Sequence, residues 1–255
     1  MNSFVRFALA QLKVDSGNIA NNLKWHKAAC SHAAQLEVDV VVFPELSLTG
    51  YELELLESLA LSRSSSIIKE LSNIAVSEGL TVIVGLPLRT KQSKPYISAA
   101  ILHPNRSVDF YHKQYLHQGE EKYCAAGEKN CFFSVNRVKL ALAVCADFTE
   151  EQHYNDAYKD NADVYLVSAL IAKNGFFEDS KLLSNIAKKI NTPVLLSNYV
   201  GKTGGLDTAG RCSVWDNNGS IVGEGSENKE GLTLCSYTNG QLCDFSYHPF
   251  ERAQK

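Results

Sequence analysis

Short apolar runs alternate with amphipathic segments along most of the chain. In the first half, runs rich in Val, Ile and Leu are separated by segments whose apolar residues recur every three or four positions. The first pattern is typical of buried strands, and the second is typical of one face of a helix. This alternation predicts strands over 4–12, 38–46, 81–88, 97–103 and 108–113, and helices over 21–36 and 66–79.

The second half of the chain repeats this alternation. It predicts strands over 138–145, 163–171 and 194–201, helices over 149–161 and 180–191, and a hairpin over 211–225 with an Asn-Gly turn. Strands that alternate with helices favour an α/β fold, and the hairpins imply mixed rather than purely parallel sheets. The similar rhythm of the two halves indicates a pseudo-symmetric layered sandwich. Because no linker or low-complexity stretch interrupts it, we predict a single domain over 1–255.

Composition narrows the possible partners and the compartment. The 255 residues carry a net charge of −3 without a basic block, which argues against a nucleic-acid partner. No apolar run approaches the ~18 residues of a membrane-spanning helix, and the start MNSFVRFALAQL lacks the features of a signal peptide. The seven cysteines form no CxxC pair, so free thiols are expected. We therefore expect a cytoplasmic protein that binds neither nucleic acid nor membrane.

Three side chains with useful chemistry stand where predicted strands end. Glu45 follows Pro44, Lys113 ends the strand over 108–113, and Cys145 ends an apolar run. Taken singly, a turn carboxylate, a surface lysine and a packed cysteine are all commonplace. However, the carboxyl ends of strands form the edge where open α/β folds place their sites. If the three strands neighbour one another, a carboxylate, an ammonium and a thiol converge on one cleft.

Such a cleft suits attack on a carbonyl or nitrile carbon. A free thiol has a pKa of about 8.5, and its thiolate is the nucleophile. The ammonium of Lys113 favours the thiolate of Cys145, and the carboxylate of Glu45 can accept its proton. Lys113 and the backbone N–H of Ala146 are then the candidate donors to the developing oxyanion.

These motifs together resemble those of a known family. FPELSLTGY, YHKQYL followed by an acidic pair, and VCADF occur in the order seen in the carbon–nitrogen hydrolase (nitrilase) superfamily. The late stretch GGLDTAGRCSVWDNNGSIVGEG resembles that family's glycine-rich strand pair. The resemblance implies a four-layer αββα sandwich with mixed sheets, no cofactor or metal, and a homodimer or higher homo-oligomer.

The resemblance also implies a role for each residue. Cys145 corresponds to the nucleophile, Glu45 to the general base, and Lys113 to the lysine that orients substrate and holds the oxyanion. A second glutamate that positions substrate and lysine corresponds best to Glu120, with Glu121 as the alternative. The implied reaction hydrolyses a small amide through a cysteine thioester and releases ammonia or an amine.

The residues after the nucleophile suggest a branch of the family. True nitrilases usually read Cys-Trp-Glu, whereas Cys145-Ala146-Asp147 resembles the amidase branches. Two departures leave the substrate open among amides, ω-amides and carbamoyl compounds. An aromatic residue commonly follows the cysteine where this chain has Ala146, and Phe148 leads into TEEQH rather than Arg-Phe-Pro-Glu. A nitrilase and a non-catalytic binding member of the fold remain the alternatives.

Other mechanisms have weaker support. A cysteine–histidine pair would require one of His103, His112, His117 and His153. His112 precedes Lys113 on a strand and should face the opposite way. There is no papain-type cysteine signature and no ligand spacing for a metal, and TGGLDTAG lacks the GK[ST] ending of a phosphate loop. Acyl-transfer members of the family often carry partner domains or membrane spans, so hydrolysis is favoured.

Several polar and aromatic residues near the same predicted edge are candidates for the substrate pocket. Tyr51, Ser168 and Asn198 are predicted to bind substrate. Lys173 and Arg211 are candidate anchors for a substrate carboxylate. Further candidates for the pocket wall are Tyr115, Asn174, Phe177 and Tyr199.

Overall fold

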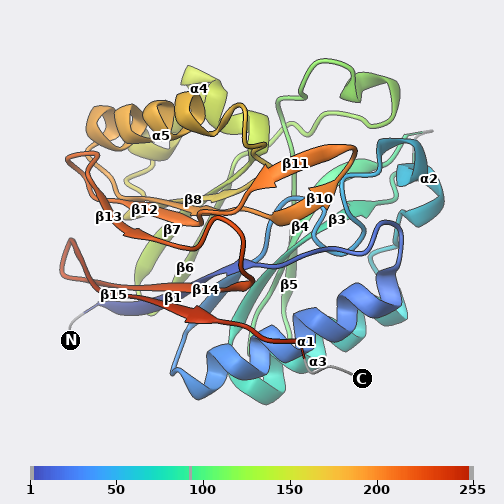
Figure 1. Cartoon of the computed structure of the whole chain (residues 1–255), viewed down its shortest axis with the longest axis horizontal. Coiled ribbons are helices and arrows are strands. Elements are labelled where there is room, and N and C mark those ends of the chain that lie inside the picture. Colours follow the sequence, from blue (N-terminus) through green and yellow to red (C-terminus); the bar gives the residue numbers. More distant parts are fainter. Residues whose placement is uncertain (1–2, 92–93, 253–255) are drawn as a thin grey trace.

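Two β-sheets packed face to face form the centre of the molecule (Figure 1). The computed structural model describes residues 3–91 and 94–252, so the predicted domain of 1–255 includes a few residues outside the described ranges. The seven-stranded sheet has the order β15 (Gln241–Pro249), β14 (Gly231–Thr238), β1 (Phe4–Gln11), β2 (Val40–Val42), β3 (Thr81–Leu88), β4 (Tyr96–Leu102) and β5 (Val108–His112). The six-stranded sheet has the order β13 (Ile221–Glu224), β12 (Ser213–Trp215), β9 (Val194–Ser197), β8 (Val164–Ser168), β7 (Val138–Val144) and β6 (Cys131–Val135).

Helices cover the outer face of each sheet. In Figure 1, α1 (Ile19–Gln35) and α3 (Ser66–Glu78) lie below the seven-stranded sheet, and α4 (Glu151–Lys159) and α5 (Phe176–Ile190) lie above the other. The ribbon β10 (Val200–Thr203) and β11 (Leu206–Ala209) pairs separately. Short elements complete the fold: η1 (Leu53–Leu55), α2 (Leu56–Leu59), η2 (Glu120–Lys122) and η3 (Cys145–Thr149). The predicted αββα sandwich with mixed sheets is confirmed.

Burial on both faces explains the apolar runs of the central strands. On β1, Phe7 and Leu9 belong to the core between the sheets, whereas Ala8 and Ala10 pack under the helices. Successive side chains on a strand point to opposite faces, and both faces are covered here, so neither set can be polar. A third core, which includes Trp215, lies under α4 and α5. These cores make the two sheets a firm platform for the loops that leave their edges.

The differences from the sequence expectations concern the ends of elements and the later strands. The strand expected over 38–46 is paired only at Val40–Val42, and the helix expected over 149–161 divides into η3 and α4. The sequence reasoning missed β6, β10, β11, β14 and β15. An Asn-Gly pair between alternating stretches at 231–249 was the available signal for the β14–β15 hairpin. The hairpin over 211–225 is present as β12–β13, with a longer turn than expected.

Strand direction brings the functional loops to one edge. The sequence argument required neighbouring strands, but β3 and β4 separate β2 from β5, and β7 belongs to the other sheet. Because β2 is parallel to β3 and two antiparallel pairings follow, β5 points the same way as β2. The segments after both strands therefore leave the same edge of the sheet. Within 3–91 and 94–252, no helix is long and apolar enough to cross a bilayer.

Gly85 on β3 allows the turn that carries Glu45 to lie against the sheet. A Cβ at Gly85 would stand 2.3 Å from both the Leu46 nitrogen and the Pro44 oxygen. We expect Gly85→Ala to lower the free energy of unfolding by about 1–3 kcal/mol, because this backbone must move to relieve the overlap. Urea unfolding measures the change.

The matched control for this substitution is Gly79→Asn. An added Cβ at Gly79 meets nothing within 4 Å, and Asn tolerates its φ of 70° better than most residues. Equal stability of the Gly85→Ala variant and the wild type would contradict the close approach of this turn to β3.

Candidate active site

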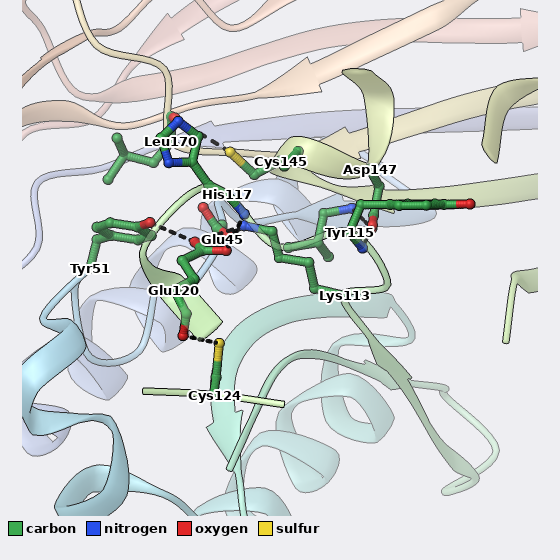
Figure 2. Close-up of polar contacts among 12 residues, drawn as sticks. Glu45, Tyr51, Lys113, Tyr115, His117, Glu120, Cys124, Cys145, Asp147 and Leu170 are labelled. Carbon is green, nitrogen blue, oxygen red and sulfur yellow. Dashed lines mark hydrogen bonds and ion pairs between the residues drawn. The ribbon is translucent and has the colours of Figure 1, made fainter. Parts of the chain in front are cut away.

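A buried lysine between two carboxylates forms the centre of the site (Figure 2). Lys113 directly follows β5, Glu45 lies in the turn after β2, and Glu120 begins η2. The Lys113 Nζ lies 2.7 Å from Glu45 Oε1 and 2.8 Å from Glu120 Oε1. The side chains of Lys113 and Glu45 have no solvent exposure, and that of Glu120 is 1% exposed. The structure thus brings together three residues that the sequence had placed at separate points.

Further hydrogen bonds orient Glu120. The Tyr51 hydroxyl donates to Glu120 Oε1 at 2.5 Å, and the His117 backbone N–H donates to Oε2 at 2.8 Å. Both carboxylate oxygens of Glu120 are therefore engaged. Glu121, the alternative second glutamate, is exposed and accepts a hydrogen bond from the Gly119 N–H at 2.7 Å. The geometry thus favours Glu120 as the second glutamate.

Burial changes the proton affinities of this group. Burial raises the pKa of Glu45 to about 7 against the opposing charge of Lys113, and the charge of Glu120 adds to the increase. Burial also works against the ammonium, but the adjacent carboxylates outweigh it and raise the pKa of Lys113 above its ordinary value. Glu45 Oε2 is buried and has no hydrogen-bond partner among the described residues. One oxygen of Glu45 is therefore available to accept a proton.

Cys145 stands at a sharp bend where β7 becomes η3. Its φ of 47° lies in the left-handed region, which residues other than glycine rarely adopt. The half-buried thiol lies 3.6 Å from the Leu170 carbonyl oxygen (Figure 2). Burial and the nearby charge of Glu45 raise the pKa of the Cys145 thiol, while Lys113 opposes this increase. The resting side chain is therefore a thiol, which needs a base to become a thiolate.

Asp147 connects the bend at Cys145 with the loop that follows Lys113. Its buried carboxylate accepts hydrogen bonds from the Val144 N–H at 2.8 Å and the Tyr115 N–H at 2.9 Å. Val144 ends β7 of the six-stranded sheet, just before Cys145. Tyr115 lies in the loop that follows β5 of the other sheet. The sequence reasoning used Asp147 only to distinguish branches of the family. That reasoning missed the contacts by which Asp147 connects the two sheets at the site.

A cavity of about 600 Å³ opens beside this group. Glu45, Tyr51, Cys145 and Ala146 all contribute to its wall, as the sequence predicted for a shared cleft. Lys113 does not line it and lies fully buried behind the carboxylate of Glu45. The volume lies within the usual range for small-molecule sites, about 300–1,000 Å³. The cavity is therefore the candidate substrate pocket.

Ser168 and Asn198 do not line this cavity, contrary to expectation. Both are fully buried. The Ser168 hydroxyl donates to the Phe43 carbonyl oxygen at 2.8 Å, which connects the two sheets. The Asn198 amide accepts from the Ile171 N–H at 2.8 Å and donates to the Ile171 carbonyl oxygen at 3.2 Å. Their side chains therefore hold backbone segments behind the pocket.

The other candidates for the pocket wall have different locations. Tyr199 is buried and donates to the Glu45 carbonyl oxygen at 2.6 Å, so it supports the turn rather than the pocket wall. The two candidate anchors, Lys173 and Arg211, line a separate cavity of about 500 Å³ together with Phe177. Asn174 is exposed. Among the described residues that line the cavity beside Cys145, none is Lys or Arg.

The histidines give little support to a cysteine–histidine pair. His103, His112 and His153 make their hydrogen bonds elsewhere, and His112 faces away from the lysine as expected. His117 lines the cavity, but its ring lies 3.3 Å from the Gln118 carbonyl oxygen and makes no hydrogen bond with Cys145 in the described part of the chain.

Within residues 3–91 and 94–252, no group of three or more His, Cys, Asp or Glu is arranged to hold a metal ion.

We expect Asp147→Asn to loosen the connection between the two sheets. An amide has one accepting oxygen in place of two, and its NH₂ would face backbone N–H groups. The free energy of unfolding should fall by about 2 kcal/mol or more, as for hydrogen bonds to charged groups. Urea unfolding measures this change.

The control for this substitution is Asp207→Asn. Asp207 is exposed and lies 3.5 Å from the exposed Lys202, so its loss should change stability by less than about 1 kcal/mol. If the two variants were equally stable, Asp147 would not have the bracing role that its contacts indicate.

Comparison with known proteins places these motifs in context. The family model for carbon–nitrogen hydrolases matches residues 6–238. A glutamine-dependent NAD(+) synthetase from Synechocystis sp. is 27% identical over 92% of this chain and 47% of the synthetase. A 2-oxoglutaramate amidase from Bacillus subtilis is 25% identical over 87% of this chain and 86% of the amidase. The chain thus spans about half the length of the curated synthetases that it matches.

Solved structures share the fold. A double mutant of the amidase from Nesterenkonia sp. AN1, in complex with acrylamide, superposes with a TM-score of 0.85 at 23% identity. The match covers 93% of this chain and 92% of the amidase. A superfamily protein from Xanthomonas campestris with an arsenic adduct in its active site superposes with a TM-score of 0.84 at 20% identity, over 92% of this chain and 90% of the other.

Proposed function

Because the chain belongs to the carbon–nitrogen hydrolase family, we propose that it is a cysteine-dependent amidase that cleaves a small amide to an acid and ammonia or an amine. The observation that supports this most strongly is the arrangement around the pocket. Glu45 and Cys145 share its wall, and Lys113 is paired with that glutamate directly behind it. A base, a nucleophile and a fixed positive charge are therefore available to one bound substrate.

In the first half of the proposed reaction, Glu45 activates the thiol. Its unpartnered Oε2 takes the proton of Cys145, and the thiolate attacks the amide carbon to form a tetrahedral intermediate. Collapse of this intermediate breaks the carbon–nitrogen bond. The protonated Glu45 gives its proton to the leaving nitrogen, which departs as ammonia or an amine, and the acyl group stays on sulfur as a thioester.

The negative oxygen of the tetrahedral intermediate needs stabilisation. An ammonium has three N–H donors, and the contacts of Lys113 with Glu45 and Glu120 use two of them. We assign the positive charge of Lys113 and the N–H of Ala146, which lines the pocket at the start of η3, to this task. Glu120 acts by holding the lysine in place.

In the second half, water replaces the amine. Glu45 accepts a proton from the water, and the resulting hydroxide attacks the thioester carbon. The carbon–sulfur bond then breaks, the acid leaves, and the proton returns from Glu45 to the sulfur of Cys145. The cycle consumes one amide and one water and needs no cofactor.

The choice of an amide over a nitrile depends on the segment after the nucleophile. Cys145-Ala146-Asp147 is the amidase-like order, and the amidase from Nesterenkonia sp. AN1 shares the fold. The names of the relatives add glutamine and 2-oxoglutaramate to the substrates to be tested. The homo-oligomeric state and the cytoplasmic location stay predictions.

We expect wild-type protein, but not Cys145→Ala, to release ammonia from at least one compound in a panel. The panel contains aliphatic amides, glutamine, 2-oxoglutaramate, N-carbamoyl compounds and nitriles. Removal of a half-buried thiol deletes little packing, so the variant should unfold within a few degrees of the wild type.

Cys243→Ala is the matched control, since Cys243 is also half-buried and does not line the pocket. Turnover retained by Cys145→Ala would refute the nucleophile. Release from nitriles alone would identify a nitrilase. No release, together with a Cys145 that does not react with iodoacetamide, would favour the non-catalytic alternative.

We expect kcat/KM to rise with pH between 6 and 8, with an apparent pKa near 7 on the acid side. Burial raises the pKa of Glu45 to about 7, so at lower pH this carboxyl is protonated and cannot accept the thiol proton. The buried groups titrate together, so the measured value belongs to the cluster. An acid limb near the ordinary value of about 4.3 for glutamate would contradict a buried Glu45 as the base.

A further inference from the structure

The ionisable side chains along the wall of the substrate pocket have an uneven charge balance. Besides Glu45 and Cys145, the wall contains Asp179, which lies in the first turn of α5, and His117. Among the described residues that line it, none is Lys or Arg. Lys113 is the nearby positive charge, but two carboxylates already pair with it. Asp179 therefore offers a substrate a negative charge at this wall, and the described lining residues add no permanent positive charge beside it.

Asp179 is an unusual carboxylate for the start of a helix. It is half-buried, and among the described residues its side chain makes no hydrogen bond and no ion pair. Its neighbour Glu178, in contrast, is exposed. Burial raises the pKa of Asp179, with His117 as the opposing charge. Because the Asp179 carboxylate lines the pocket and makes no hydrogen bond of its own with the described residues, a bound ligand with a matching donor would pair with it.

The rest of the wall suits a methylene chain. Leu53, Leu170 and Leu206 also line the cavity. With about 600 Å³, the cavity exceeds what the acyl part of acetamide would fill. An extended acyl chain can therefore contact leucine side chains along its length and place its far end beside a polar group.

We propose that Asp179 makes this pocket selective for amides whose acyl chain carries a protonated amine. The carboxylate would accept a charge-assisted hydrogen bond from that ammonium, while the amide group lies at Cys145. By the same argument, an acyl chain that ends in a carboxylate would meet a like charge without a Lys or Arg to neutralise it. This inference rests on the proposed amidase function and specifies its substrate class.

The test compares three amides of equal chain length at pH 8, where an aliphatic amine is protonated and ordinary imidazoles are largely uncharged. These are 5-aminopentanamide, pentanamide and glutaric acid monoamide. We expect kcat/KM to be highest for the amine and lowest for the acid. In Asp179→Asn, the ratio of the amine to pentanamide should fall by about tenfold or more, as expected when a hydrogen bond between charged groups is lost.

Glu178→Gln is the matched control. It removes the same charge from the same turn of α5, but at an exposed position that does not line the pocket. We expect it to keep the wild-type ratio. Asp179→Ser is a second variant in case Asp179→Asn unfolds. A wild-type preference for the acid, or an unchanged ratio in the Asp179 variants, would overturn the inference and leave the amidase proposal standing.

A binding readout separates failure of the inference from failure of the proposed function. Each of the three compounds is tested for slowing the alkylation of Cys145 by iodoacetamide, measured by mass spectrometry of the peptide that contains it. If no compound were hydrolysed, the amidase proposal would fail for these amides. The order of protection would still decide recognition by Asp179. Stronger protection by the amine than by the acid, lost in Asp179→Asn, supports it, and equal protection by both overturns it.

Discussion

The ion pairs of Lys113 with Glu45 and Glu120 are the interaction on which the site depends. Removal of a charged group from water costs several kcal/mol per ion, so this lysine is tolerable only while carboxylates stay beside it. Two short contacts, at 2.7 and 2.8 Å, meet that requirement. Tyr51 in turn holds Glu120. The same constraint leaves one oxygen of Glu45 buried and unpartnered, so the arrangement that tolerates the charge also supplies a base of raised pKa.

The fold satisfies this constraint by joining two sheets at one edge. The lysine and both carboxylates come from segments of the seven-stranded sheet, whereas Cys145 leaves the six-stranded sheet. Contacts such as those of Asp147 and Ser168 cross between the sheets and fix their relative position near the bend. Catalysis of the proposed kind requires reacting atoms within a few tenths of an ångström of their places. Buried polar side chains that bond to the backbone of both sheets provide such rigidity.

The pocket outside the central group shows how one fold can serve different substrates. The family relation and the buried group support cleavage of a carbon–nitrogen bond, but they say little about what is attached to the acyl carbon. The residues that line the rest of the pocket come from loops and from the first turn of α5, where Asp179 lies. Among the described lining residues, none is a Lys or Arg that would pair with a carboxylate at the far end of an acyl chain. The proposed catalytic group and the proposed determinant of selectivity, Asp179, therefore lie on different segments of the chain.

The sequence by itself determined the local features of this protein. Apolar runs predicted most strands of both sheets. Three motifs singled out Glu45, Lys113, Cys145 and Glu120, and their catalytic roles stay predictions. The strand predictions succeed because hydrophobic periodicity and turn chemistry are properties of neighbouring residues. Only the tertiary structure decided which strand edges meet. It therefore also decided that Ser168 and Asn198 are buried braces. In the same way, it placed Asp147 between the two sheets and Asp179 in the pocket wall. Those roles depend on contacts between segments far apart in the chain, which local pattern does not specify.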